Sequence, residues 1–189
     1  MNKFNIVALS IVVASGALAE SKPFQLSLVP DVAIEDRNTD INGVSLGVWN
    51  ENPSEKFQWQ FGFINGATGD SVGVQWFIFL PTLFNYAENY MGAQMAWVNY
   101  TAGEMTGLQW GWIGNYAGDL TGVQFGIVNI AKAVDGGFQW GAVNYAETAN
   151  NLFQLGLVNI IPDNEWFSDF PSDLAKGFVI VNWTFGDSK

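Results

Sequence analysis

Carboxylates are the side chains with the clearest chemical potential in this sequence, because it contains no histidine and no cysteine. That composition excludes thiol nucleophiles, disulfides and the usual zinc ligands, and it removes the most common general base. The remaining enzymatic possibility is a carboxylate pair of the glycosidase type. The densest acidic set is Asp163, Glu165, Asp169 and Asp173. A solvated acidic loop or a weak Ca²⁺ site explains this set more simply. We therefore expect no catalytic residue and no cofactor, and leave metal binding open.

The charge balance and the aromatic content narrow the class of protein. The 189 residues fit one domain, and 18 acidic residues against 7 basic ones give a net charge of −11. Such a charge repels phosphates, so no nucleic-acid partner is expected. Aromatic residues make up 15% of the chain, with nine Trp, whereas charged residues make up 13%. This combination favours β-structure that faces apolar surroundings on more than one side.

The N-terminus has the pattern of a signal peptide. Lys3 precedes an apolar run from Ile6 to Leu18, and Ala17 and Ala19 give the small-x-small motif of signal peptidase sites. The sequence therefore predicts a signal peptide over residues 1–19 and a single exported β-repeat domain over residues 20–189.

A repeat of 15 residues organises that domain from about residue 43 to residue 160. Seven of the nine glutamines fall in one slot: Gln60, Gln75, Gln94, Gln109, Gln124, Gln139 and Gln154. A Gly slot follows two residues later, as in Gly111, Gly126 and Gly141, and an Asn slot five residues later, as in Asn129, Asn144 and Asn159. Leu80 and Gly114 break the Asn slot. Such a fixed period indicates a repeat architecture.

Within each repeat the pattern alternates with a period of two, which predicts strands. Large apolar residues share one face of each strand, and Gln and Gly share the other. The tryptophans expected to face lipid or a partner are Trp76, Trp97, Trp110, Trp112 and Trp140. An acidic, aromatic loop over residues 162–175 is the place where a short helical turn is expected, and a degenerate ninth copy predicts a closing strand over residues 177–185.

The tandem GxQxGxxN units and the final apolar strand resemble those of exported bacterial surface-repeat proteins. The resemblance covers about residues 24–185. It implies a location in the cell envelope or at the cell surface, and it carries no established activity over to this chain.

Two all-β architectures agree with the pattern. The first is an antiparallel β-barrel of about ten strands in the outer membrane, in which each repeat is one strand and one turn. The second is a β-solenoid with 15-residue coils, in which equal slots stack and the Asn slot forms a ladder.

Three observations favour the barrel. The aromatic side chains are too bulky for the thin interior of a 15-residue coil. Every repeat spacing is odd, so no insertion flips the side-chain face between neighbouring antiparallel strands. Thirdly, a solenoid would stack four acidic residues that lie ten positions after the Gln slot: Glu55, Asp70, Glu104 and Asp119. In the barrel Trp110 faces lipid and Gln109 the interior, so Trp110→Lys is expected to be the more damaging substitution.

The sequence therefore predicts an envelope or surface protein with a structural, surface-interaction or narrow-pore role. Outer-membrane lipid is its expected partner, and a protein or glycan partner stays open. The alternative is a secreted or periplasmic β-solenoid that binds a partner or a glycan through its aromatic face.

Overall fold

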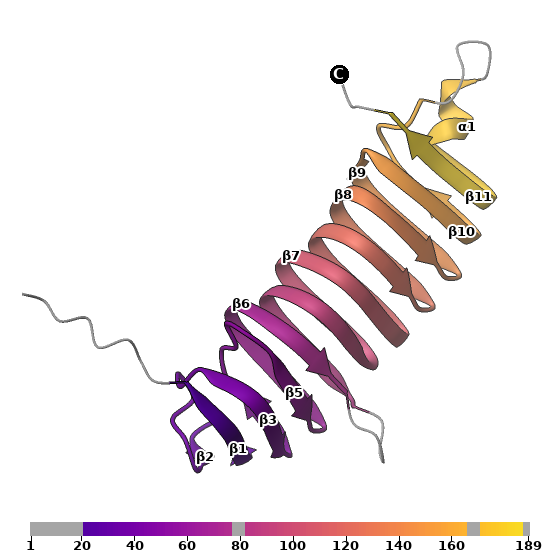
Figure 1. Ribbon diagram of the computed structural model, residues 1–189. Coiled ribbons are helices and arrows are strands. Elements are labelled where there is room, and N and C mark those ends of the chain that lie inside the picture. Colours follow the sequence, from indigo (N-terminus) through magenta and orange to yellow (C-terminus); the bar gives the residue numbers. More distant parts are fainter. Residues whose placement is uncertain (1–20, 77–81, 166–170, 187–189) are drawn as a thin grey trace, which may run out of the picture.

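The chain is a β-solenoid of about nine turns with 15-residue coils. It is described by a computed structural model that covers residues 21–76, 82–165 and 171–186 (Figure 1). The barrel prediction is wrong, and the solenoid alternative is confirmed. Successive coils pair in parallel, whereas a barrel of hairpins requires antiparallel neighbours. No helix among the described residues has the length and hydropathy that a membrane span requires.

Eleven strands and one short helix make up the described chain. They are β1 (Lys22–Val29), β2 (Val32–Ala33), β3 (Ile41–Gly47), β4 (Trp49–Glu51), β5 (Gln58–Phe61), β6 (Ile64–Gln75), β7 (Phe84–Phe125), β8 (Val128–Trp140), β9 (Val143–Ala149), β10 (Asn151–Ile160), α1 (Ser172–Lys176) and β11 (Gly177–Phe185). The strand β7 continues without a break through more than two coils, because each coil turns its corners without leaving the extended backbone conformation. The helix α1 overlaps the end of the stretch in which a helical turn was expected.

The glutamines of the repeat stack directly on one another inside the solenoid. All seven are buried, and Gln75 pairs in register with Gln60 on one side and with Gln94 on the other. From Gln75 to Gln154, each Nε2 donates to the Oε1 of the glutamine one coil earlier, over 2.7–2.9 Å. In several coils the same Nε2 also donates to a backbone carbonyl, for example from Gln124 to Ile130 at 3.2 Å. The Gln slot therefore forms an unbroken ladder of buried amides.

A second ladder is built by asparagines. It comprises Asn50, Asn65, Asn85, Asn99, Asn115, Asn129, Asn144 and Asn159, each buried. From Asn50 to Asn144, every Nδ2 donates to the Oδ1 of the asparagine one coil later, over 2.7–3.1 Å. The ladder is continuous although Gly114 is not part of it, because Asn115, one residue further along the chain, fills the place. Asn85 fills the other apparent gap; Leu80 lies outside the described residues.

Small apolar side chains fill the rest of the interior. Ala67, Ala87, Ala117, Ala131 and Ala146 are buried two residues after the Asn slot. A column of larger buried residues follows at the next corner: Tyr90, Met105, Leu120 and Val134. The coil thus needs no Trp or Phe in its core. The solenoid was disfavoured on the wrong assumption that the aromatic side chains would have to fit inside the coil, whereas they point outward and the amides point inward.

Glycine is required where neighbouring coils approach most closely. Gly92, Gly107 and Gly122 lie two residues before the Gln slot and have φ values of 139°, 125° and 141°. A Cβ at any of them would overlap the carbonyl oxygen of the glycine one coil earlier. These positions combine a left-handed backbone with contact between backbones, which only glycine tolerates without strain.

Each end of the solenoid has its own cap. At the N-terminal end β2 pairs antiparallel with β1, and β1 pairs parallel with β3. Nearby, Arg37 and the Tyr86 hydroxyl both donate to the carboxylate of Glu51, and Trp49 Nε1 donates to the Tyr86 oxygen at 3.0 Å. Burial and the bond to Glu51 raise the pKa of Tyr86, so this phenol stays a neutral donor.

The C-terminal cap is β11, which has the predicted bounds but does not form a further parallel coil. It pairs antiparallel with β10, and Asn182 faces Gln154. Because β11 runs antiparallel to the coils, a further coil could not pair with it in the parallel register that the other coils use. Figure 1 shows α1 and β11 together at this end of the stack.

The structure reverses the expected order of two neighbouring substitutions. Gln109 is 0% exposed and Trp110 is 48% exposed. Gln109→Lys would bury an unpaired charge and remove one hydrogen-bond partner each from Gln94 Oε1 and Gln124 Nε2. Each lost hydrogen bond costs about 0.5–1.5 kcal/mol, and the buried charge costs more. We therefore expect Gln109→Lys to abolish folding or to lower the unfolding free energy by more than about 3 kcal/mol.

Trp110→Lys, the matched control, should change the unfolding free energy by less than about 1 kcal/mol, since it replaces an exposed residue. Urea denaturation followed by far-UV circular dichroism measures both effects. A Trp110→Lys chain less stable than the Gln109→Lys chain would contradict the solenoid.

Candidate functional site

A wholly apolar surface follows the outer side of the strands that carry the Gln slot. The residues just before and just after each Gln slot point outward, because side chains alternate along a strand. The column before the slot contains Val44, Trp59, Val74, Ala93, Leu108, Val123, Phe138 and Phe153. The column after it contains Leu46, Phe61, Trp76, Met95, Trp110, Phe125, Trp140 and Leu155. We call these two columns the apolar face.

A third apolar column extends this surface around the corner of the coil. Three residues after the Gln slot lie Trp97, Trp112, Ile127 and Leu157, all exposed, with Trp112 at 65% and Leu157 at 72%. In the described part of the chain no charged or hydrogen-bonding side chain other than the Trp indoles occurs in any of the three columns. The five tryptophans predicted to face lipid or a partner all lie here: Trp76, Trp110 and Trp140 on the apolar face, and Trp97 and Trp112 at the corner.

Ring contacts hold the aromatic residues of this surface in a connected network. Phe125 lies at the centre, with ring centroids 6.2 Å from Trp110, 5.7 Å from Trp140 and 6.0 Å from Phe138. Phe138 stacks in turn on Phe153, with centroids 5.9 Å apart. The side chains therefore support one another and form a preorganised surface.

The Gly slot creates a groove between two of the apolar columns. Its floor is formed by Gly111, Gly126, Gly141 and Gly156, and the groove has a volume of about 760 Å³. Trp110, Phe125 and Trp140 form one wall, which we call the aromatic ridge. Trp112, Ile127 and Leu157 line the other wall. A Cβ at Gly126 would fall 2.8 Å from Asn115 Nδ2, so the glycine also makes room for the asparagine ladder.

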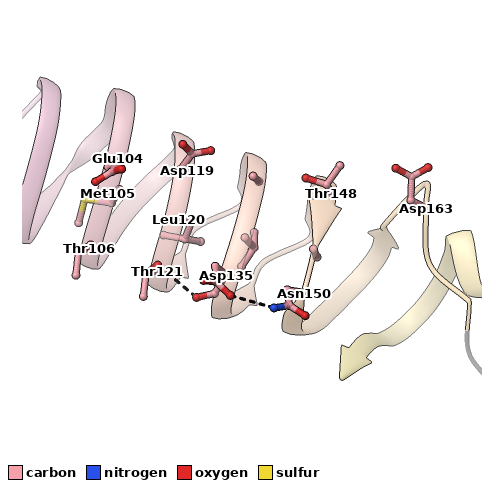
Figure 2. A pocket seen from close by; sticks show the side chains of 13 residues that line it. Glu104, Met105, Thr106, Asp119, Leu120, Thr121, Asp135, Thr148, Asn150 and Asp163 are labelled. Carbon is pink, nitrogen blue, oxygen red and sulfur yellow. Dashed lines mark hydrogen bonds between the residues drawn. The ribbon is translucent and has the colours of Figure 1, made fainter. Parts of the chain in front are cut away.

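Acidic and hydroxyl side chains gather at the opposite corner of the coils. Figure 2 shows Glu104, Asp119, Thr148 and Asp163 following one edge of successive coils, beside a groove of about 730 Å³. Below them Asn150 Nδ2 donates to Asp135 Oδ1 at 3.2 Å. We call the row of Glu55, Asp70, Glu104, Asp119 and Asp163 the acidic edge.

The acidic loop predicted from the sequence is only partly assembled in the described structure. Asp163 joins the acidic edge, whereas Glu165 and Asp173 are exposed and do not line that groove. Asp169 lies outside the described residues. Among the side chains that the structure describes, no three acidic residues come together as a possible metal-binding group.

The expected repulsion between stacked carboxylates is relieved in part by interposed neutral residues. Asp70 is in register with Asn89, whose Nδ2 donates to Asp70 Oδ1 at 2.7 Å. Asn89 Oδ1 accepts the backbone N–H of Glu104 at 2.8 Å. Further along, Asp119 is in register with Ala133, and Ala133 with Thr148. Asn89 does not stand out in the sequence because an insertion moves it away from a strict 15-residue count.

Glu104 and Asp119 are neighbours on the acidic edge with no neutral residue between them, so they allow a direct test of its electrostatics. Gly118 packs on the backbone of Gly103, so Asp119 and Glu104 occupy adjacent coils. We expect Asp119→Asn to raise the melting temperature by about 1–3 °C at low salt, because it removes a like-charge neighbour. The gain should disappear in 0.5 M NaCl, and Thr121→Asn serves as a neutral control. An unchanged or lower melting temperature at low salt would contradict the repulsion.

Comparison with known proteins leaves the function to be inferred from these surfaces. No family model, no curated protein and no solved structure matches the chain.

Proposed function

We propose that this protein is an exported, non-enzymatic interaction module of the bacterial envelope, and that its apolar face is the surface through which it assembles. The observation that carries the proposal is the length of uncharged, exposed apolar surface along successive coils. Soluble monomers rarely expose contiguous apolar patches larger than a few hundred Å². A surface of this kind is stable in water only when something covers it.

The construction of the solenoid supports a binding role rather than a purely structural reason for the aromatic side chains. The interior is filled by amides, alanines and a few larger apolar residues, so the exposed tryptophans are not needed to close the core. Trp and Tyr are the side chains that contribute most at binding surfaces. Their position on a rigid, repetitive sheet supplies a preorganised docking surface at little entropic cost.

Export is the second part of the proposal, and it rests on the predicted signal peptide. The resemblance to exported surface-repeat proteins supports the same location. The interior ladders consist of uncharged amides that do not titrate, so they suit a compartment whose pH varies.

Site-specific photocrosslinking in living bacteria tests this proposal. A benzoylphenylalanine at Phe125 places the reactive group on the aromatic ridge, whereas the same residue at Tyr100 places it on the outer side of the strands that carry the Asn slot. Tyr100 is 41% exposed, so it is a fair control for accessibility. We expect a discrete crosslinked product from Phe125 and none from Tyr100. No product at Phe125, or equal products at both positions, would overturn the assignment of the apolar face as the docking surface.

A further inference from the structure

We propose that the apolar face binds the same face of a second copy of this chain, with the aromatic ridge of each copy lying in the glycine-floored groove of the other. This inference rests on the proposed function and names the partner of that surface. The product is a symmetric dimer of two solenoids, packed sheet against sheet.

The chemistry of the face selects a partner of this kind. A glycan needs hydrogen-bonding side chains beside the aromatic rings, and the three apolar columns offer none in the described chain apart from the indole N–H groups. Nucleic acid and anionic lipid are repelled by the net charge of −11. A second copy presents a surface equally free of charge, so pairing buries no ionised group.

The size of the face fits a stable dimer. About nine coils, spaced about 4.8 Å apart, give a length of roughly 40 Å. The apolar face and the third column together span about 17 Å across the strands, which gives an area of about 700 Å². Specific interfaces bury about 800 Å² on each partner, so these three columns come close to this requirement.

The shape of the face determines how the two copies are oriented. The ridge and the groove lie side by side, and both follow the solenoid axis. A two-fold axis parallel to the solenoid axis places each ridge opposite the partner's groove, and both N-terminal ends then lie at the same end of the dimer. A two-fold axis along the strands would instead place ridge against ridge.

The repeat and the charge distribution agree with the parallel arrangement. Both copies have the same spacing between coils, so one ridge residue can enter the partner's groove at every coil. The acidic edge lies at the corner opposite the groove, and in this dimer the acidic edges of the two copies lie on the far sides. Their carboxylates stay in water and apart from each other.

Sedimentation velocity of the purified full chain tests whether the dimer forms. We expect a species of twice the 20.7 kDa chain mass at micromolar concentrations. Trp110→Ser on the ridge and Ile127→Lys on the groove wall should each raise the dimer dissociation constant by more than about tenfold. Tyr100→Ser, on the opposite side of the coil, is the matched control and should leave it unchanged. Far-UV circular dichroism confirms that each variant keeps its strands.

Spin-label distances test the orientation, and the absence of native cysteine makes the labelling clean. Thr68, Ala102 and Glu147 are exposed and occupy the same slot, three residues after the Asn slot, in early, middle and late coils. In the parallel dimer, labels on single-cysteine variants at these positions give nearly the same interchain distance. In an antiparallel dimer, the distance is shortest at Ala102 and longer at both other positions, and that result would overturn the ridge-in-groove geometry.

The outcomes separate this inference from the function on which it rests. A monomeric purified chain that still gives a crosslinked product at Phe125 in cells would overturn the dimer and leave the docking surface in place. The mass of that product would then identify a different partner, and vesicles of phosphatidylcholine that bind the purified chain would identify lipid. A monomeric chain with no crosslinked product would overturn both proposals.

Discussion

The stacking of side-chain amides is the interaction on which this structure depends. A primary amide has donor and acceptor groups that cannot be left unpaired in a buried site without a cost of about 1–3 kcal/mol each. Parallel coils about 4.8 Å apart place identical amides at hydrogen-bonding distance. The seven glutamines and eight asparagines therefore fix both the 15-residue period and the parallel register.

The two ladders run in opposite directions, which gives the interior an electrostatic balance. Asparagine amides donate toward the C-terminal end, as from Asn129 to Asn144, and glutamine amides donate toward the N-terminal end, as from Gln139 to Gln124. Their dipoles oppose each other along the axis. The first asparagine is capped by the Ser27 hydroxyl at 2.8 Å, whereas Gln154 Oε1, at the last rung of the glutamine ladder, has no hydrogen-bond partner among the described residues.

Much of the fold could be predicted from the sequence, because the repeat itself is visible. The Gln slot, the outward aromatic column and the bounds of β11 follow from periodicity alone. The choice between barrel and solenoid does not, since alternation with a period of two places Gln109 and Trp110 on opposite faces in either architecture. Which face is buried depends on the pairing partner, and neighbouring parallel and antiparallel strands have the same local pattern.

Asn85 and Asn115 were missed for a related reason: coil geometry tolerates a shift in sequence that a fixed count does not. The repeated Asn-Tyr-Ala tripeptide was the signal that could have located both.

The candidate surface follows from the same constraint that builds the fold. Once amides fill the interior, the bulky residues of each repeat must lie outside, where the Gly slot separates them into a ridge and a groove. The tryptophans could be identified from the sequence, whereas the groove could not, because it requires knowledge that Gly111 and Gly126 stack in register.

Hydrogen exchange of the glutamine side-chain amides, measured by NMR on the native chain, tests the central claim most directly. The account predicts that the NH₂ protons of the ladder glutamines, such as Gln109 and Gln124, exchange far more slowly than those of an exposed amide. Exchange of these protons at the rate of free glutamine would contradict the buried ladders and the solenoid built on them.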